Sequence, residues 1–326
     1  MPEQSSWQPS APLENLRRRA TLLADIRRFF SERQVLEMEV PILSRRATSD
    51  PHIDSITAEC SGEPAFLATS PEFGLKRLLA AGIGDCYYLG KAFRNGEAGG
   101  RHNPEFTMLE WYRVGWDDHR LMIEVGELLS WLLRISRVHS CSYRTLFLEH
   151  LGLDPHRATL RELSDCVAYN LELSFEPVDK DECLDLLMSH HIEPNMDMGG
   201  KPGITLVYDF PASQAALARV EEDEHGVPVA RRFEAYVGGM ELANGYWELT
   251  DAREQLRRFE ADQRYRGENG KPVNPFEERL VQALESGIPS GMPECAGVAL
   301  GVDRLLMLAC GASRIDEVVA FPIGRA

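Results

Sequence analysis

Residues 87–114 read YYLGKAFRNGEAGGRHNPEFTMLEWYRV, and this stretch decides the fold. Two apolar, aromatic-rich segments flank a glycine-rich connector, a pattern that predicts a β-hairpin with a long tip. The tip carries Arg94, Arg101 and His102 on permissive backbone, a composition suited to polyphosphate. Glu110 follows on the far strand, so an acidic zone adjoins the cationic one. A solvated hairpin loop is the plain alternative, and the stretch by itself names no reaction.

Composition bounds the class of protein. The chain has 326 residues, of which 44% are hydrophobic, enough for a large core in one or two domains. It carries 35 Lys and Arg against 51 Asp and Glu, a net charge of -16. Such a surface repels nucleic acid on average, although a local basic site can still bind phosphate. The charge therefore argues weakly against tRNA or DNA as the main partner.

The N-terminal residues, the apolar stretches and the cysteines indicate the cellular compartment. The first residues, MPEQSSW, lack the basic and apolar regions of a secretory signal. No stretch approaches the roughly 20 apolar residues that span a bilayer. The seven cysteines are scattered and form no Cys-x-x-Cys pair, which fits reduced thiols and argues against structural zinc or a disulfide framework. We therefore expect a cytoplasmic protein without a membrane segment.

Apolar periodicity and turn residues predict an α+β fold. Residues 1–12 are polar and proline-containing and are expected to form a loose tail. Residues 140–200 carry helical patterns without strand signals, so we expect a helical insertion there, ending in a loop at 195–203. Other predicted helices cover residues 13–33, 73–81, 117–133, 251–266, 275–286 and 303–309. Predicted strands cover residues 35–40, 53–60, 65–68, 204–208, 232–237, 240–249 and 297–301. Strand hairpins grouped with helices, without βαβ alternation, favour an antiparallel sheet.

A second hairpin, at residues 232–249, concentrates polar side chains. The sequence has no Walker A, G-x-G-x-x-G or H-E-x-x-H motif, so ATP would have to bind by another device. Glu234 and Glu241 can converge on a curled hairpin, and two hard carboxylates would suit Mg²⁺ on ATP phosphates. Asn244 and Glu248 are four residues apart along one strand and share a face. An exposed strand face is the alternative for either pair.

A third segment, GVALGVDRLLML at residues 297–308, joins a strand to a helix. Its glycines let a flat ligand approach, and Asp303 is expected to cap the helix. Arg304 then lies in the first helical turn, where a cation is unfavourable by roughly 0.3–1 kcal/mol without an anionic partner. An arginine in that position suggests a phosphate or a stacked base, with an ordinary surface arginine as the alternative.

Three segments resemble, in order, the three motifs of class II aminoacyl-tRNA synthetases. Residues 35–41 resemble motif 1, the dimer-forming element, residues 93–112 resemble motif 2, and residues 297–308 resemble motif 3. The block ELANGYWE at 241–248 is similar to the lysyl branch. The resemblance implies a homodimer with one class II catalytic domain over residues 13–326, an antiparallel β-sheet flanked by helices.

Two features depart from lysyl-tRNA synthetases. Those enzymes carry an anticodon-binding barrel before motif 1, whereas motif 1 begins near residue 35 here, so we expect no such domain. Ala299 stands where the tRNA enzymes of this branch usually have glycine, which narrows the amino-acid pocket by a methyl group. Both features resemble truncated lysyl-synthetase paralogues that activate (R)-β-lysine with ATP. Those paralogues transfer it to a lysine ε-amine of translation elongation factor P.

The resemblance implies an ATP site that includes Mg²⁺. Arg94 would hold the α-phosphate and stabilise charge during in-line attack by the substrate carboxylate. Phe106 and Arg304 would sandwich adenine. Glu234 and Glu241 would bind Mg²⁺. Arg101 and His102 would reach the distal phosphates of ATP. The other implied nucleotide-binding positions are Asn95, Gly96, Asn103, Leu242 and Gly301.

The resemblance also implies a pocket for (R)-β-lysine. The segment Ser70-Pro71-Glu72 would meet the backbone amine of the amino acid. Acidic and aromatic side chains would surround its side-chain ammonium, because buried acids near an aromatic suit a dicationic substrate. These and the remaining implied substrate positions are Glu110, Tyr112, Asn244, Glu248 and Ala299.

One position breaks the family pattern. The family motif reads Arg-Asn-Glu, whereas this chain reads Arg94-Asn95-Gly96, with Glu97 one place later. The family glutamate usually faces the adenine amine. Either Glu97 replaces it after a shift of the loop, or backbone contacts suffice.

The main hypothesis is an ATP-dependent ligase that modifies elongation factor P, with tRNA an unlikely acceptor. A protein acceptor does not demand a basic surface, which agrees with the net negative charge. One alternative is a single-domain lysyl-tRNA ligase that uses α-lysine. Another is a catalytically silent paralogue that binds a regulatory amino acid, against which the retained Arg94, Glu234, Glu241 and Arg304 speak.

Overall fold

The structure is a computed structural model that describes residues 7–196, 203–286 and 291–326. Parts of the predicted tail (1–6) and loop (197–202) lie outside the described residues. The chain forms two compact units. Unit 1 comprises the described residues within Met1–Gly115, Thr250–Cys295 and Ala299–Ala326, and unit 2 comprises those within Trp116–Leu249 and Ala296–Val298. The single domain expected over residues 13–326 stays a prediction.

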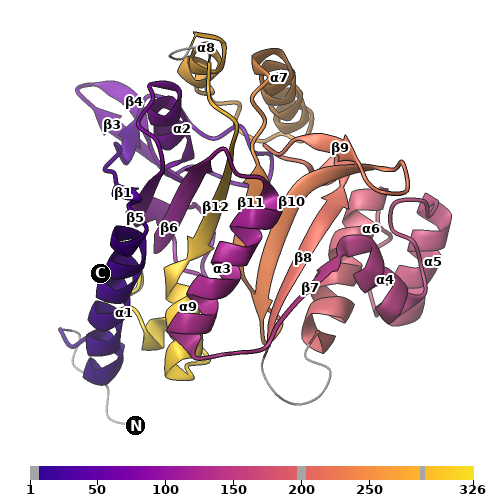
Figure 1. Ribbon diagram of the computed structural model, residues 1–326, viewed down its shortest axis with the longest axis horizontal. Helices are drawn as coiled ribbons and strands as arrows, with labels where there is room; N and C mark the ends of the chain where they lie inside the picture. The colour runs from indigo at the N-terminus through magenta and orange to yellow at the C-terminus, as the bar shows by residue number, and fades with distance from the viewer. Residues whose placement is uncertain (1–6, 197–202, 287–290) are drawn as a thin grey trace. The chain divides into compact units, whose positions relative to one another are not determined.

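Unit 1 is organised on the predicted central hairpin, which the structure confirms (Figure 1). Strand β5 (Cys86–Phe93) pairs antiparallel with β6 (Glu105–Val114), and the residues between them form the tip. Strand β1 (Leu36–Glu37) pairs parallel with β5. It is shorter than the predicted strand at 35–40, because bonding to β5 ends where the Met38 amide donates to Tyr87 O.

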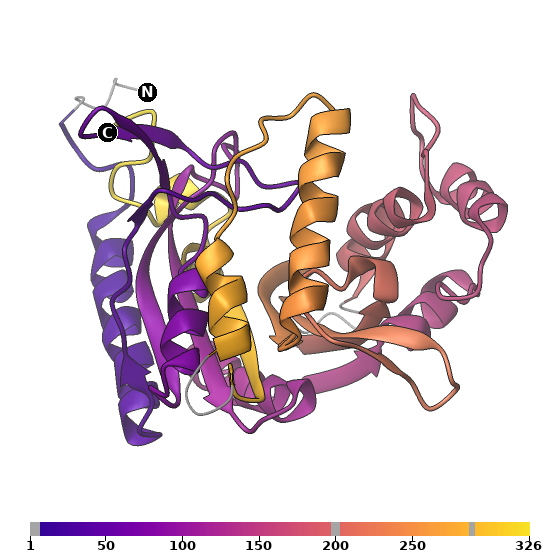
Figure 2. The same ribbon diagram turned by 90° about the horizontal axis from the view of Figure 1, so that it is seen from above.

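Helices cover the strands of unit 1 on two sides. Figure 2 shows these strands between α1 (Leu13–Glu32) on one side and α2 (Glu72–Ala80) with α8 (Glu278–Ser286) on the other. Helix α1 is held by aromatic packing, since Phe30 stacks on Tyr87 with ring centroids 4.5 Å apart. The remaining elements of unit 1 are β2 (Leu43–Ser44), β3 (Thr57–Cys60), β4 (Glu63–Leu67), α7 (Ala252–Glu268), α9 (Val302–Cys310) and η4 (Ile315–Glu317). Strands β2, β4 and β3 form a separate small sheet in that order.

Unit 2 carries the second predicted hairpin. Strand β10 (Pro228–Val237) pairs antiparallel with β11 (Met240–Trp247), and the turn lies at Gly238 and Gly239. Both glycines have positive φ, 60° and 65°, as a two-residue hairpin turn of the primed type requires. Outward from β10 the sheet continues with β8 (Ile204–Pro211) and β7 (Val138–Ser142), and β9 (Val220–Glu222) also pairs with β10.

The predicted helical insertion is present in unit 2. It contains α4 (Tyr143–Leu151), α5 (Leu160–Asn170) and α6 (Lys180–Leu187), followed by the short turns η1 (Met188–Ile192) and η2 (Glu193–Asn195). These elements share a core with β8, in which Tyr143 stacks on Phe147. Helix α3 (Asp118–Leu133) precedes them, and the Asp117 side chain caps its start. The short turn η3 (Ala212–Gln214) follows β8.

The α+β class is confirmed, but not every strand pair is antiparallel. The pairs β1–β5 and β7–β8 are parallel, so the strands form a mixed sheet. Strand β7 carried no strand signal, because only Cys141 is buried and the other side chains are exposed or partly exposed. Strand β12 (Cys295–Gly301) contributes residues to both units. Among the described residues, no helix combines the length and the apolar character needed to cross a membrane.

Candidate active site

The hairpin tip in unit 1 gathers the predicted nucleotide-binding side chains. The Arg94 amide donates to Pro104 O (2.9 Å), which closes the base of the tip. The Arg94 guanidinium carbon lies 5.2 Å from the centroid of the Phe106 ring. Arg94, which is predicted to contact the α-phosphate, therefore lies beside Phe106, which is predicted to stack on adenine.

The structure explains why glycine is acceptable at residue 96. Gly96 has a φ of +80°, in the left-handed region, where a residue with a Cβ pays roughly 1–2 kcal/mol. A glutamate would be strained there in this loop conformation. The Glu97 carboxylate lies 3.6 Å from the guanidinium of Arg94. Whether Glu97 reads adenine stays a prediction.

Asp303 does not cap the helix that follows it, so that prediction was wrong. Helix α9 begins at Val302 with Gly301 as its N-cap, and Asp303 already lies inside the first turn. Its buried carboxylate instead accepts from the Thr107 amide (2.6 Å) and from Arg19 Nη1 (2.6 Å). Arg19 also donates to the Thr107 hydroxyl (2.6 Å). This network fixes the start of α9 on β6 and on α1.

Arg304 lies in the first turn of α9, as predicted, and turns toward the hairpin tip. Its guanidinium donates a hydrogen bond to Nε2 of His102. Burial lowers the pKa of His102, and the positive charge of Arg304 lowers it further. The imidazole is therefore neutral at neutral pH and can accept this bond. The structure thus brings Arg94, His102, Phe106 and Arg304 to one region of unit 1.

Asn103 is occupied by protein contacts. Its side-chain amide donates to Glu105 O (2.6 Å), and its Oδ1 accepts from the Ile323 amide (3.0 Å). These bonds tie the tip to the C-terminal segment. They favour a supporting role for Asn103, and its predicted contact with the nucleotide is untested.

Two acidic side chains of unit 1, Glu110 and Glu72, are among those predicted to form the lysine pocket. Glu110 and Tyr112 are two residues apart on β6, share a face, and are both buried. The Tyr112 hydroxyl donates to Glu110 Oε1 (2.8 Å), which orients the carboxylate. Glu72, the first residue of α2, pairs with the buried ammonium of Lys76 (2.6 Å). Each carboxylate is thus held in place by a neighbour in the same unit.

Two further acidic side chains, Glu234 and Glu241, lie on the β10–β11 hairpin of unit 2. Glu234 is directly opposite Asn244, and Tyr236 is opposite Glu241. The register shifts between these pairs, so Leu242 is an extra residue on β11. Without the shift, Glu241 and Asn244 would face opposite sides of the sheet. The bulge therefore supports the prediction that Glu234 and Glu241 share one face.

Arg232 was missed in the sequence and is central to this hairpin. Its guanidinium donates to Glu234 Oε1, to Asn244 Oδ1 (3.2 Å) and to Gln214 O (3.0 Å). The Tyr236 hydroxyl donates to Glu234 Oε2. Arg232 and Tyr236 flank Glu234 at i−2 and i+2, so the period of a strand could have identified both.

For three of the predicted site residues, the structure gives mainly their location and exposure. Arg101 is exposed at the tip, and Ala299 is partly exposed on β12. Glu248 is 1% exposed and bridges to Ala218 just beyond β11. Their roles in nucleotide and substrate binding stay predictions.

The fold is that of a class II synthetase. The chain belongs to the family described as tRNA synthetases class II (D, K and N), which matches residues 8–325. This match confirms the resemblance drawn from the three motifs.

The chain is also similar over its whole length to proteins named elongation factor P–(R)-β-lysine ligase. The protein of that name from Yersinia enterocolitica serotype O:8 / biotype 1B is 48% identical, covering 100% of both chains. Those from Yersinia pestis (strain Pestoides F) and Yersinia pseudotuberculosis serotype O:3 (strain YPIII) are each 47% identical, covering 99% of both chains. The particular relatives expected from the sequence are thus the ones found.

Proposed function

We propose that this protein activates (R)-β-lysine with ATP and transfers the lysyl group to a lysine ε-amine of elongation factor P. Full-length similarity to proteins of that name supports the choice of substrate and acceptor. The structural observation that carries the proposal is the buried Glu110–Tyr112 pair on β6. A buried carboxylate on the strand that continues from a cationic loop can pair with a substrate ammonium while the loop holds phosphates.

The first step needs positioning and charge stabilisation but no protein nucleophile. The substrate carboxylate attacks the α-phosphorus of ATP, the bond to the β-phosphate oxygen breaks, and pyrophosphate leaves. Arg94 would stabilise charge on the α-phosphate, and the neutral His102 would act through hydrogen bonds. Phe106 and Arg304 would hold adenine. In the second step the acceptor amine attacks the carbonyl of the mixed anhydride, and AMP leaves with the bonding electron pair.

Mg²⁺ fits the acidic hairpin of unit 2 chemically. Glu234 and Glu241 offer hard carboxylate oxygens on one face, and each oxygen has two lone pairs, so the bonds from Arg232 and Tyr236 leave Glu234 able to ligate. When bound, the ion would neutralise charge on the ATP phosphates. Arg232 would keep the Glu234 carboxylate oriented.

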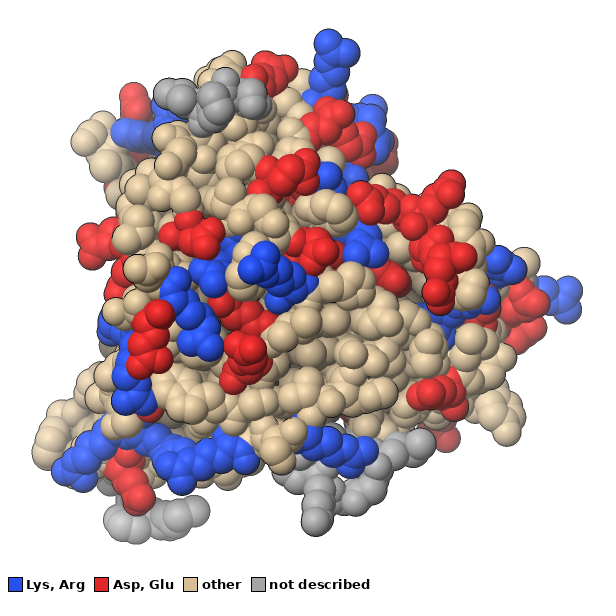
Figure 3. Space-filling model, viewed as in Figure 1, with Lys and Arg blue, Asp and Glu red and all other residues tan. Residues whose placement is uncertain are grey.

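The acceptor is proposed to be a protein rather than tRNA. On the face drawn in Figure 3, Lys and Arg side chains are interspersed with Asp and Glu. With a net charge of -16, such a surface offers little attraction for a polyanion. We place the protein in the cytoplasm, where elongation factor P acts.

Exposed apolar side chains support a homodimer through motif 1. Leu36 is 50% exposed, and Ile42 and Leu43 are also exposed, all within a few residues of β1. Adjacent exposed apolar residues of this kind mark protein interfaces. Light scattering should give the mass of a dimer for the wild type and a smaller mass for Leu36→Glu.

ATP–pyrophosphate exchange tests the activation step. (R)-β-lysine should support exchange better than α-lysine, and Glu110→Gln should raise the KM for (R)-β-lysine at least roughly tenfold, because a charge-assisted bond is lost. Glu105→Gln, an exposed acid on the same strand, is the control and should change the KM little. Exchange with neither amino acid would contradict the proposal and favour a silent regulatory paralogue.

A further inference from the structure

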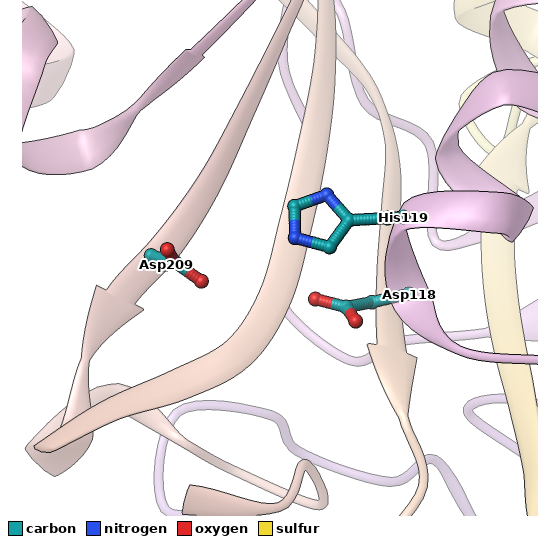
Figure 4. A group of neighbouring side chains, drawn as sticks. All are labelled: Asp118, His119 and Asp209. Atoms are coloured by element: carbon teal, nitrogen blue, oxygen red, sulfur yellow. The ribbon is translucent and has the colours of Figure 1, made fainter. Parts of the chain in front are cut away.

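Three side chains outside the proposed active-site residues converge in unit 2. Asp118 and His119 are the first two residues of α3, and Asp209 lies near the end of β8. One donor atom from each lies within 4.8 Å of the other two. Figure 4 shows the carboxylates and the imidazole turned toward one another across the gap between helix and strand. Two carboxylates and one imidazole form a ligand set used for divalent metal ions.

The Asp118 carboxylate has an unsatisfied atom. The residue is 1% exposed, and its Oδ1 accepts from Arg231 Nη2 (2.8 Å). Its Oδ2 is buried and has no hydrogen-bond partner among the described residues. Leaving a buried carboxylate oxygen without a donor or a cation is costly, roughly 1–3 kcal/mol or more. A ligand at this oxygen would remove that cost.

Arg231 is compatible with a metal ion beside it. It contacts Oδ1 of Asp118 and Oδ1 of Asp209 (3.3 Å), which leaves the Oδ2 atom of each for another partner. A group that holds one oxygen of a ligating carboxylate is a common outer-sphere support. Asp223 interacts electrostatically with Asp209, and Glu221 interacts electrostatically with Arg231. The carboxylates around this group therefore outnumber the single guanidinium of Arg231. The local charge therefore favours a further cation.

His119 selects the class of cation. An imidazole ligand suits transition metals such as Zn²⁺, whereas Mg²⁺ and Ca²⁺ prefer oxygen alone. The ring packs edge-on against Tyr208, with centroids 5.0 Å apart, which limits its orientations. It is only partly buried, so an ion can reach the site.

We propose that Asp118, His119 and Asp209 bind a divalent transition-metal ion, with Zn²⁺ as the representative. Such an ion ties the start of α3 to β8 within unit 2. The site uses no thiolate, which is why the scattered cysteines gave no indication of it. It is composed of different residues from the proposed Mg²⁺ ligands, Glu234 and Glu241.

Titration of the chelator-treated full-length protein with ZnCl₂ by calorimetry tests the proposal. The wild type should bind one Zn²⁺ with high affinity, and Zn²⁺ should raise its melting temperature. His119→Gln and Asp209→Asn should each lower the affinity at least roughly tenfold. Asn is chosen because residue 209 has a φ of 57°, which Asn tolerates. His190→Gln, an exposed histidine of the same unit, is the control and should bind as the wild type does.

Co²⁺ gives a second readout that does not depend on stability. Bound Co²⁺ should show ligand-field bands in the visible spectrum without the charge-transfer bands of a thiolate, and the bands should be lost in His119→Gln. Circular dichroism without metal checks that each variant folds, and if one variant fails the other decides. Failure of the wild type to bind Zn²⁺, or equal binding by wild type and both variants, would overturn the proposal.

Discussion

The carboxylate of Asp303 accepts a 2.6 Å hydrogen bond from the backbone amide of Thr107. These two residues directly adjoin Arg304 and Phe106, the pair proposed to sandwich adenine. The bond, reinforced by Arg19, fixes the start of α9 relative to β6. The spacing between the two adenine platforms is therefore set by buried protein contacts within unit 1. Such preorganisation reduces what ATP must order when it binds.

Asp303→Asn should weaken both stability and ATP binding. The substitution removes the charge that faces Arg19, so the free energy of unfolding should fall by roughly 1.5–3 kcal/mol. The KM for ATP should rise because the two platforms are less well fixed. Urea unfolding and pyrophosphate exchange measure the two effects. Asp316→Asn, at an exposed pair with Arg314, should change neither, and an unchanged Asp303→Asn would refute the positioning role.

Arg304→Ala should disable adenylate formation while the protein stays folded. The guanidinium is proposed to stack on adenine, a contact of up to about 2 kcal/mol, and it also holds His102. Adenylate formation should fall at least roughly tenfold, with the melting temperature near that of the wild type. Arg314→Ala, which removes an exposed arginine, serves as the control. Near-normal adenylation by Arg304→Ala would remove the adenine sandwich from the account.

Restoring the family glutamate at residue 96 should not improve the enzyme. Because Gly96 has a φ of +80°, Gly96→Glu should cost roughly 1–2 kcal/mol of stability or shift the tip. The KM for ATP should stay the same or rise. Gly96→Ala separates backbone strain from the new carboxylate, since it should show the same stability loss. A lower KM in Gly96→Glu would mean that the tip readily adopts the family conformation.

Asp185 should make stability depend on pH. Burial raises its pKa from 3.8 to about 6, opposed by Arg232 and by the bond from Gln214. Between these two pH values the folded state binds more protons than the unfolded state, so the free energy of unfolding falls as pH rises from about 4 to 6. Above pH 6 the loss is complete.

Asp185→Asn should therefore stabilise the protein at pH 7.5 and hardly at pH 4. After allowance for partial exposure, the gain at pH 7.5 should be about 1–2 kcal/mol by urea unfolding. Asp165→Asn alters an exposed acid of α5 and should show little difference at either pH. Equal effects of Asp185→Asn at both pH values would mean that folding does not raise the pKa of this carboxyl.

Local patterns were sufficient to predict the two hairpins and most helices. The aromatic strands around residues 94–104 and the double glycine at 238–239 are short-range signals, and the structure has both features. Strand β7 could not be predicted in this way, because its pairing with β8 is long-range and its side chains are mostly exposed.

The site shows the same division. The sequence placed Arg304 in a first helical turn, where its positive charge is unfavourable. In the structure its guanidinium is hydrogen-bonded to His102. Asp303 was read as a cap because capping is a local property, whereas its actual partners come from α1 and β6. The bulge at Leu242 and the hydrogen bonds of Arg232 depend on the register between β10 and β11. Local sequence patterns do not determine that register.

The most direct test of the central claim is the intact mass of elongation factor P after incubation with the protein, ATP and Mg²⁺. Parallel reactions contain (R)-β-lysine or α-lysine, and a third replaces the factor with tRNA. The account predicts addition of one lysyl group to elongation factor P, faster with (R)-β-lysine, and little charging of tRNA. Unmodified elongation factor P together with efficient charging of tRNA by α-lysine would contradict it.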